Sequence, residues 1–404
     1  MTQTDQRLLY LKEGLQYIPK LLQLLDKNRL SSTYGCFDRA FWHYRTSDFP
    51  SGMYQEAVLP LALAYKINHP ENSYFEEPRL KELVSAGIDY ASRSSHPDGC
   101  CDDYFPYERA AGATAFALYT CTEATLLLDI KFEQFNEFFE LRGRYLANQG
   151  VQESGTLSNH KALFVLALHN VFLVTGNTFF KDQAAQQLKK LLILQTEEGW
   201  FPEYEGCDPG YLTFTIDFLA KYYAKTQEPT LLEPLKRALQ FASHFMHPDG
   251  SYGGEYGSRN TFHFMPHGME LFGQEVPIAT ALSDKFLNSL KDQTRSYLED
   301  DRIFIHYVYD YLQSHIDFCE TRSSERLPYE QKTSKFFPIA GMLVQSVENS
   351  FAVFSTHKGG VGKIFRDGKL VYSDCGLVGK TSTGQKFISQ LEADFKISQE
   401  NETL

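Results

Sequence analysis

Four glycine-centred segments recur along the chain at intervals of roughly fifty residues: His96-Pro97-Asp98-Gly99-Cys100, Asn148-Gln149-Gly150-Val151-Gln152, Thr196-Glu197-Glu198-Gly199-Trp200 and His247-Pro248-Asp249-Gly250-Ser251. Each segment leads into an apolar stretch rich in aromatic residues. A helix pair of this length cannot bury its apolar face alone, so it must stack on its neighbours. The repeat therefore predicts an α/α toroid over residues 1–327, with the glycine loops at one rim and their polar residues converging on one cleft.

The stretches between the loops have the apolar spacing of helices. Residues 6–30 and 184–194 repeat leucine at helical intervals and are expected to be outer helices. Residues 161–174 and 211–223 are more uniformly apolar and are expected to be inner helices. A glycine after an outer helix is a typical stop signal, because glycine tolerates positive φ.

The pattern changes near Pro328, and from Ser350 onward the apolar residues alternate with a period close to two. The pair Asp367-Gly368 lies between two such runs, which is a strong hairpin signal. We expect an antiparallel β region over residues 345–404, the start of a larger sandwich. The predicted fold is thus mainly α, with a partial antiparallel sheet or sandwich at its C-terminal end.

Composition narrows the classes of partner. The chain has 404 residues and a net charge of -12, which argues against broad binding to nucleic acid or to anionic membranes. A polyanionic substrate stays compatible with this charge, because a local cationic cleft can exist on an acidic protein. No apolar run reaches the roughly eighteen residues of a membrane span, so no membrane partner is expected. The composition does not predict an oligomeric state.

The N-terminal sequence and the cysteines bear on localisation and on metals. The first seven residues lack a signal-peptide pattern, so we expect a cytoplasmic protein, or a periplasmic or secreted one if a leader has been removed. The seven cysteines are scattered and give neither a disulfide framework nor a paired zinc motif. No cofactor and no metal ligand set is predicted, although a divalent metal in the β region is left open.

The sharpest chemical signal is Asn159-His160 together with Tyr211. Each lies where a loop enters an inner helix, and the two helices belong to adjacent repeats, so the three side chains are expected to share a rim. An amide can hydrogen-bond a carboxylate, while imidazole and phenol groups can exchange protons. We also expect His160 to lower the cost of ionising the Tyr211 phenol. Taken singly, Asn159 is more simply interpreted as a helix cap and His160 as a packed core residue; the three tracts together, in register with the repeat, favour a site.

Other rim residues are candidates for contacts to the substrate. The loops at 36–48, 102–109, 200–211 and 252–263 are expected to line one groove, and Arg259 offers bidentate recognition of a carboxylate. Aromatic side chains there suit stacking on sugar rings, although an aromatic residue in a helical protein is more often core. The predicted substrate-binding set is Trp42, His43, Arg45, Tyr204, Tyr256, Arg259, His263 and His267.

An Asn-His pair opening one inner helix and Pro209-Gly210-Tyr211 opening the next resemble the heparinase II/III-like and alginate-lyase-like polysaccharide lyases. The tract from His357 to Gly376 resembles the histidine strand and following turn of that family. The resemblance implies an α/α toroid followed by a β-sandwich, and an acidic polysaccharide or oligosaccharide as the substrate. It implies that Asn159 and His160 neutralise a uronate carboxylate, that Tyr211 transfers protons, and that His357 joins the catalytic set.

Three functions remain open from the sequence. The first is a lyase that cleaves a uronate-containing polysaccharide by β-elimination. The second is a toroid glycoside hydrolase acting on uronate-containing oligosaccharides, which needs acidic residues in the rim loops. The third is a glycan-binding protein without catalysis. The candidate acids for the hydrolase are Asp102, Asp103, Glu203, Glu205 and Glu255.

Overall fold

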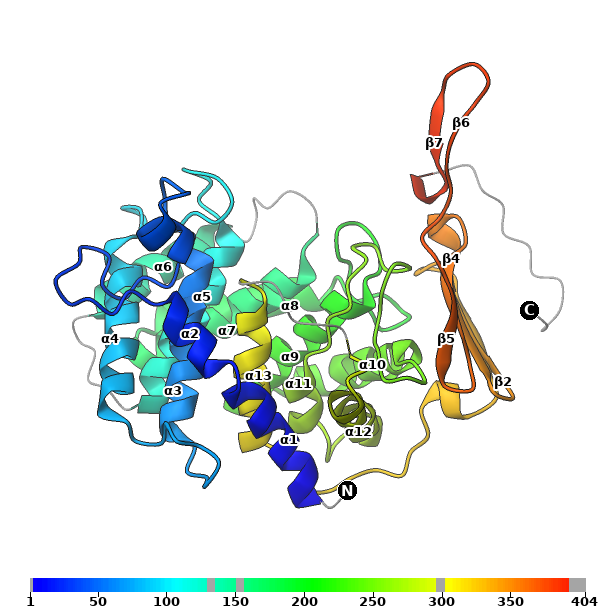
Figure 1. The fold of residues 1–404 in the computed structure, drawn as a ribbon, viewed down its shortest axis with the longest axis horizontal. Helices are drawn as coiled ribbons and strands as arrows, with labels where there is room; N and C mark the ends of the chain where they lie inside the picture. The colour runs from blue at the N-terminus through cyan, green and yellow to red at the C-terminus, as the bar shows by residue number, and fades with distance from the viewer. Residues whose placement is uncertain (1–2, 129–134, 150–155, 296–301, 392–404) are drawn as a thin grey trace.

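A helical domain and a small sheet make up the protein in a computed structural model that describes residues 3–128, 135–149, 156–295 and 302–391 (Figure 1). Gly150, at the centre of one repeat segment, lies outside the described residues. The outer helices are α1 (Gln3–Leu15), α2 (Ile18–Leu24), α4 (Pro78–Arg93), α6 (Asn136–Gln149), α8 (Thr178–Leu192), α10 (Leu232–Ala242) and α12 (Pro277–Asp292). The inner helices are α3 (Val58–Lys66), α5 (Ala111–Leu128), α7 (Ser158–Thr175), α9 (Pro209–Thr226), α11 (Pro266–Leu271) and α13 (Phe304–Ile316).

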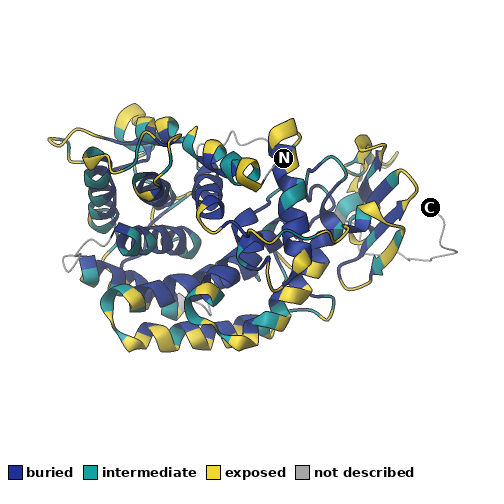
Figure 2. Ribbon diagram, turned by 90° about the horizontal axis from the view of Figure 1, so that it is seen from below, coloured by how far each residue is buried: buried dark blue, intermediate teal, exposed yellow. Residues whose placement is uncertain are grey.

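The inner helices form a closed ring, which confirms the predicted toroid. Each of α3, α5, α7, α9 and α11 packs against the next inner helix, and α13 packs against both α11 and α3. The inner helices α5 and α7 are buried on nearly all sides, while outer helices such as α8 and α10 keep an exposed polar stripe (Figure 2). This division is the reason why the inner segments are uniformly apolar and the outer segments periodic. None of the described helices has the length and apolar character that crossing a membrane requires.

Glycine is required where the repeat loops turn. Gly99, Gly199 and Gly250 all have positive φ, and a Cβ atom on Gly199 would lie 2.6 Å from a backbone oxygen of α10. Each turn follows an outer helix and directs the chain back toward an inner one. The loops therefore end at the rim where the inner helices begin, as the sequence predicts.

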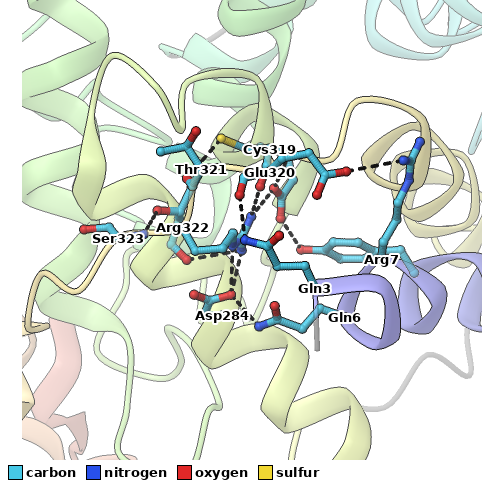
Figure 3. Close-up of polar contacts among 12 residues, drawn as sticks. Gln3, Gln6, Arg7, Asp284, Cys319, Glu320, Thr321, Arg322 and Ser323 are labelled. Carbon is cyan, nitrogen blue, oxygen red and sulfur yellow. Dashed lines mark hydrogen bonds and ion pairs between the residues drawn. The ribbon is translucent and has the colours of Figure 1, made fainter. Parts of the chain in front are cut away.

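Polar contacts fix the N-terminal helix to the last repeats of the ring (Figure 3). The Gln6 amide donates to Asp284 at 2.8 Å, and the Tyr10 hydroxyl donates to the buried Glu270 carboxylate at 3.0 Å. Arg322 joins these groups, since its guanidinium lies 2.6 Å from Glu270 and 2.7 Å from Asp284. The outer face of the last repeats is thereby connected to the first helix.

The β region is a five-stranded antiparallel sheet in the order β1-β2-β3-β4-β5, with a separate β6–β7 hairpin that projects beyond it (Figure 1). The sheet begins at Thr333, earlier than the predicted boundary at 345, because the short and polar β1 gives a weak strand pattern. The predicted hairpin at Asp367-Gly368 joins β4 to β5. The strands are β1 (Thr333–Phe337), β2 (Met342–Val347), β3 (Ser350–Ser355), β4 (Val361–Arg366), β5 (Lys369–Asp374), β6 (Val378–Lys380) and β7 (Lys386–Ile388).

The sheet packs against the last repeats through aromatic rings and two lysines. Phe337 of β1 lies 4.8 Å from Phe241 of α10, measured between ring centroids. The Lys358 ammonium donates to the carbonyl oxygens of Glu255 at 2.6 Å and Gly257 at 2.8 Å, and Lys363 pairs with the Glu255 carboxylate at 2.9 Å. The sheet therefore holds the loop at 252–263, which belongs to the rim.

We predict that Arg322→Met destabilises the fold by about 3–5 kcal/mol, because it leaves the fully buried Glu270 carboxylate without its cation. Chemical denaturation of the variant measures this loss. Lys12→Met is the control, since Lys12 and Glu71 are half-exposed partners 3.7 Å apart and such a pair contributes about 0–1 kcal/mol. Equal effects of the two substitutions would contradict the assigned role of Arg322.

Candidate active site

A cavity of about 470 Å³ lies at the rim where the inner helices begin. The first turns of α5, α7, α9 and α13 contribute Gly112, Asn159, Tyr211 and His306 to its lining. A helix N-terminus presents unpaired backbone N–H groups and a partial positive charge. These four helix ends therefore favour an anion in the cavity, although the chain as a whole is acidic.

Asn159 and His160 lie side by side in the first turn of α7. The Asn159 side-chain amide donates to the Glu203 carboxylate at 2.6 Å, and its backbone N–H donates to the other Glu203 oxygen at 3.2 Å. Glu203 is only 1% exposed, and this burial raises the pKa of its carboxyl group to about 7. The His160 ring packs over Gly112, where a Cβ atom would lie 2.6 Å from the ring. A small residue in α5 thus admits the imidazole to the cavity wall.

Tyr211 is positioned by the cap of α9. Asp208 accepts a hydrogen bond from the Tyr211 backbone N–H at 3.0 Å and one from the Arg259 backbone N–H at 2.8 Å. Burial raises the pKa of the Tyr211 phenol, and nearby Tyr204 and Glu203 raise it further, so the expected ease of ionisation is wrong. The Tyr211 hydroxyl therefore stays protonated at neutral pH.

Two more imidazoles line the cavity. The His263 ring lies 5.2 Å from the Tyr211 ring, its Nδ1 atom hydrogen-bonds the Tyr307 hydroxyl, and burial lowers its pKa to about 3. His306 Nδ1 lies 2.7 Å from the Glu56 carboxylate, and the His306 ring stacks on Phe116. A carboxylate behind an imidazole orients the ring and stabilises the imidazolium that forms when the ring takes a proton.

Four acidic residues at or near the cavity are held by polar contacts, whereas Glu205 is exposed in the loop beside Tyr204. Asp103 pairs with Arg302 at 2.5 Å, and the Glu108 carboxylate accepts three backbone N–H groups of its own loop. Asp102 binds the His96 ring and two backbone N–H groups, and Glu255 pairs with Lys363. Among the residues that the structure describes, Asp103 and Glu108 are the carboxylates in the cavity lining, and these contacts hold both of them.

Several predicted residues meet at the cavity. Asn159, His160, Tyr204, Tyr211 and His263 line it, and the Arg259 guanidinium stacks on the Tyr204 ring at 4.0 Å.

Other predicted residues lie elsewhere. Tyr256 is 1% exposed and bonds the His247 ring at 2.8 Å, so its expected sugar-facing position is wrong. The Trp42 indole donates to the Leu24 carbonyl at 2.8 Å, and the loop at 36–48, with His43 and Arg45 exposed on it, contributes nothing to the described cavity lining. His357 is exposed in a short turn after β3, against Gly341, and is not part of that lining either.

His267 belongs to a buried charge cluster rather than to the cavity. The His267 ring lies 2.9 Å from Asp317 and 3.7 Å from Asp217. His267, Asp217 and Asp310 are spaced closely enough to ligate a metal ion. The Lys221 ammonium, however, lies 2.5 Å from Asp217 and 3.3 Å from Asp310. This ammonium already supplies the positive charge that the two carboxylates require.

Sequence reasoning missed Glu56, His306 and Arg302. None of them lies in a glycine loop, and Glu56 and His306 stand 250 positions apart. The sequence feature that could have identified them is a charged or imidazole side chain inside an otherwise apolar inner segment. Such a group needs a buried partner and therefore indicates a polar contact in the interior.

The sequence matches no family model and no curated protein. Among solved structures, the fold is similar to a chondroitin AC lyase of Streptomyces coelicolor A3 in complex with chondroitin sulphate, with a TM-score of 0.56 and 11% identity. That match covers 90% of this chain and 54% of the lyase, so the chain spans about half the length of that protein. A tyrosine-to-alanine mutant of the same lyase matches with a TM-score of 0.53, 11% identity and coverage of 89% and 54%. At this identity the similarity establishes the toroid fold alone.

We predict that Glu203→Gln stabilises the protein increasingly as the pH rises. The folded pKa of Glu203 is raised from 4.5 to about 7, so the stability linked to its proton is present below about pH 4.5 and is lost as the pH rises through about 7. One unit of pKa shift corresponds to about 1.4 kcal/mol. In thermal melts, the difference in Tm between Glu203→Gln and the unsubstituted protein should increase with pH. The control Glu205→Gln, at an exposed residue, should show no such difference. A difference independent of pH would contradict the assignment.

Proposed function

We propose that this chain is a polysaccharide lyase that cleaves a uronate-containing polysaccharide by β-elimination. The observation that carries the proposal is the convergence of four helix N-termini, an amide, three imidazoles and a protonated phenol on one cavity. The similarity to a chondroitin AC lyase in complex with chondroitin sulphate supports an acidic polysaccharide as the substrate class. The finer resemblance to heparinase II/III-like and alginate-lyase-like enzymes stays part of the proposal.

β-Elimination requires three groups at one sugar ring. The C5 proton next to the uronate carboxylate is removed by a base, and its electron pair forms an enediolate that needs neutralisation. The C4–O bond then breaks as the C4–C5 double bond forms, and the leaving oxygen takes a proton from an acid. The reaction consumes no water. Before the next turnover the base returns its proton to the solvent and the acid takes one back from it.

The cavity offers a residue for each of these roles. Asn159 and His160, at the N-terminus of α7, bind the carboxylate and its enediolate form. His306 is the base, because Glu56 behind it stabilises the imidazolium that results. Tyr211 is the acid, because burial keeps its phenol protonated at neutral pH. His263, whose low pKa makes it a weak base, lies against Tyr211 and helps to position it.

A glycoside hydrolase is the alternative, and the arrangement of acids favours the lyase over it. Hydrolysis needs a general acid and a second carboxylate or an activated water. Asp103 and Glu108 face the cavity but are held by Arg302 and by backbone N–H groups. Incubation with alginate, heparan, hyaluronan and chondroitin distinguishes the two functions, because lyase products carry a conjugated double bond that absorbs in the near ultraviolet. Cleavage without this absorbance would contradict the proposal.

We predict that Tyr211→Phe lowers kcat by about 10² to 10⁴ with little change in binding, because only the proton-donating hydroxyl is lost. The rate of double-bond formation on the best polymer measures kcat. Tyr44→Phe is the matched control, since Tyr44 is 62% exposed in the loop at 36–48, outside the cavity. Full lyase activity in Tyr211→Phe would refute the role of the phenol.

We predict a similar loss of kcat for His306→Gln, because glutamine can still contact Glu56 but cannot take a proton. His69→Gln controls for the same change at a histidine outside the cavity lining. His160→Gln should instead raise KM as well as lower kcat, since His160 is assigned to the carboxylate. If His306→Gln is fully active and His160→Gln is inert, the base is His160.

A further inference from the structure

Glu203 is a buried carboxyl group directly behind the cavity wall. It is joined to Asn159 by two bonds, one to the side-chain amide at 2.6 Å and one to the backbone N–H at 3.2 Å. Its own backbone is fixed as well, since its N–H and C=O pair with Gly206 and with the Ser258 hydroxyl at 2.8 Å and 2.7 Å. Because the backbone is fixed and the residue is only 1% exposed, the carboxyl group has little room to move, and the Asn159 amide is the group that adapts to its protonation state.

The two protonation states of Glu203 require opposite orientations of the Asn159 amide. An ionised carboxylate only accepts hydrogen bonds, so the amide must turn its NH₂ group toward Glu203, as the structure has it. A protonated carboxyl group donates an O–H, which the Asn159 carbonyl oxygen accepts once the amide has rotated by about half a turn. The second Glu203 oxygen keeps its bond to the Asn159 backbone N–H in both states. Only the protonated state thus releases both N–H bonds of the Asn159 amide from Glu203, and Asn159 is part of the cavity lining.

We propose that Glu203 is a positioning residue whose proton turns the Asn159 amide toward the cavity, so that a uronate carboxylate binds to the protonated form. Protonation also removes a negative charge from behind the wall, and this acts in the same direction. The inference rests on the proposed function only in naming a uronate as the ligand. It adds that binding of the uronate is accompanied by uptake of a proton.

The surroundings of Glu203 place this change near neutral pH. Burial is the main cause that raises its pKa to about 7, and Asp208 at the cap of α9 raises it further. His160 and the hydrogen bonds from Asn159 act in the opposite direction. Tyr211, the remaining titratable group close to it on α9, stays protonated over this range. A bound uronate adds a second negative charge beside the carboxyl group and raises its pKa again.

The experiment measures binding without turnover. Hyaluronan and alginate tetrasaccharides are titrated calorimetrically into Tyr211→Phe and into Tyr211→Phe/Glu203→Gln, at about pH 6 and about pH 8, on either side of the pKa of about 7. The glutamine mimics the protonated acid, because its NH₂ group donates to the Asn159 carbonyl while its oxygen accepts from the Asn159 backbone. The parent in this comparison is Tyr211→Phe. Its affinity should fall about tenfold more between the two pH values than the affinity of Tyr211→Phe/Glu203→Gln, because the fraction of the parent with a protonated Glu203 falls about tenfold.

Buffers of different ionisation enthalpy give the second readout, the number of protons taken up on binding. The parent should take up more protons near pH 7 than the glutamine variant. Asn159→Ala in the same Tyr211→Phe background keeps Glu203 but has no amide to turn. It should lose the part of the pH dependence that comes from the amide and keep only the part that comes from the Glu203 charge, and it guards against misfolding of the glutamine variant. Equal pH dependence in all three proteins, or no binding of either tetrasaccharide to the parent at about pH 6, overturns the inference. Uronate binding with the expected pH dependence but without lyase activity in the wild-type chain would refute the proposed function alone.

Discussion

Closure of the inner ring is the constraint on which the rest of the structure depends. Because α13 packs against α3 as well as α11, every inner helix has two inner neighbours, and every long inner helix begins at the same rim. Groups far apart in sequence, such as Glu56 and His306, are brought into contact only by this closure. The same geometry gathers the positive ends of several helices around one cavity, which gives an acidic protein a local preference for anions.

The helix ends also make it possible to bury carboxylates at the rim. Glu203 and Asp208 are each about 1% exposed, and each accepts at least one backbone N–H from the first turn of an inner helix. Without such donors an isolated buried carboxylate is strongly destabilising. These carboxylates in turn orient the amide and the phenol that face the cavity, so capping of the helices and construction of the site are one arrangement. The sheet completes it from outside, since Lys358 and Lys363 hold the loop that carries Arg259.

The sequence predicts those parts of the site that stand in register with the repeat. Asn159, His160 and Tyr211 follow glycine loops at corresponding positions of adjacent repeats, so the fifty-residue period alone places them at one rim. It does not distinguish Tyr204, which faces the cavity, from Tyr256, which a short turn directs into the core toward His247. It also does not separate His357 from its neighbour Lys358, because one step along a tight turn decides which side chain reaches the toroid. The Glu56–His306 pair depends on ring closure and has no local signature.

The central claim is that the cavity cleaves its polymer by elimination rather than by addition of water. Mass spectrometry of products formed by the wild-type protein in water enriched with ¹⁸O tests it directly. Elimination predicts that the masses of the products, corrected for the exchange of reducing-end oxygen with water, sum to the mass of the substrate. It also predicts a double bond at the new non-reducing end. Products that together carry one added water molecule containing ¹⁸O would contradict the account.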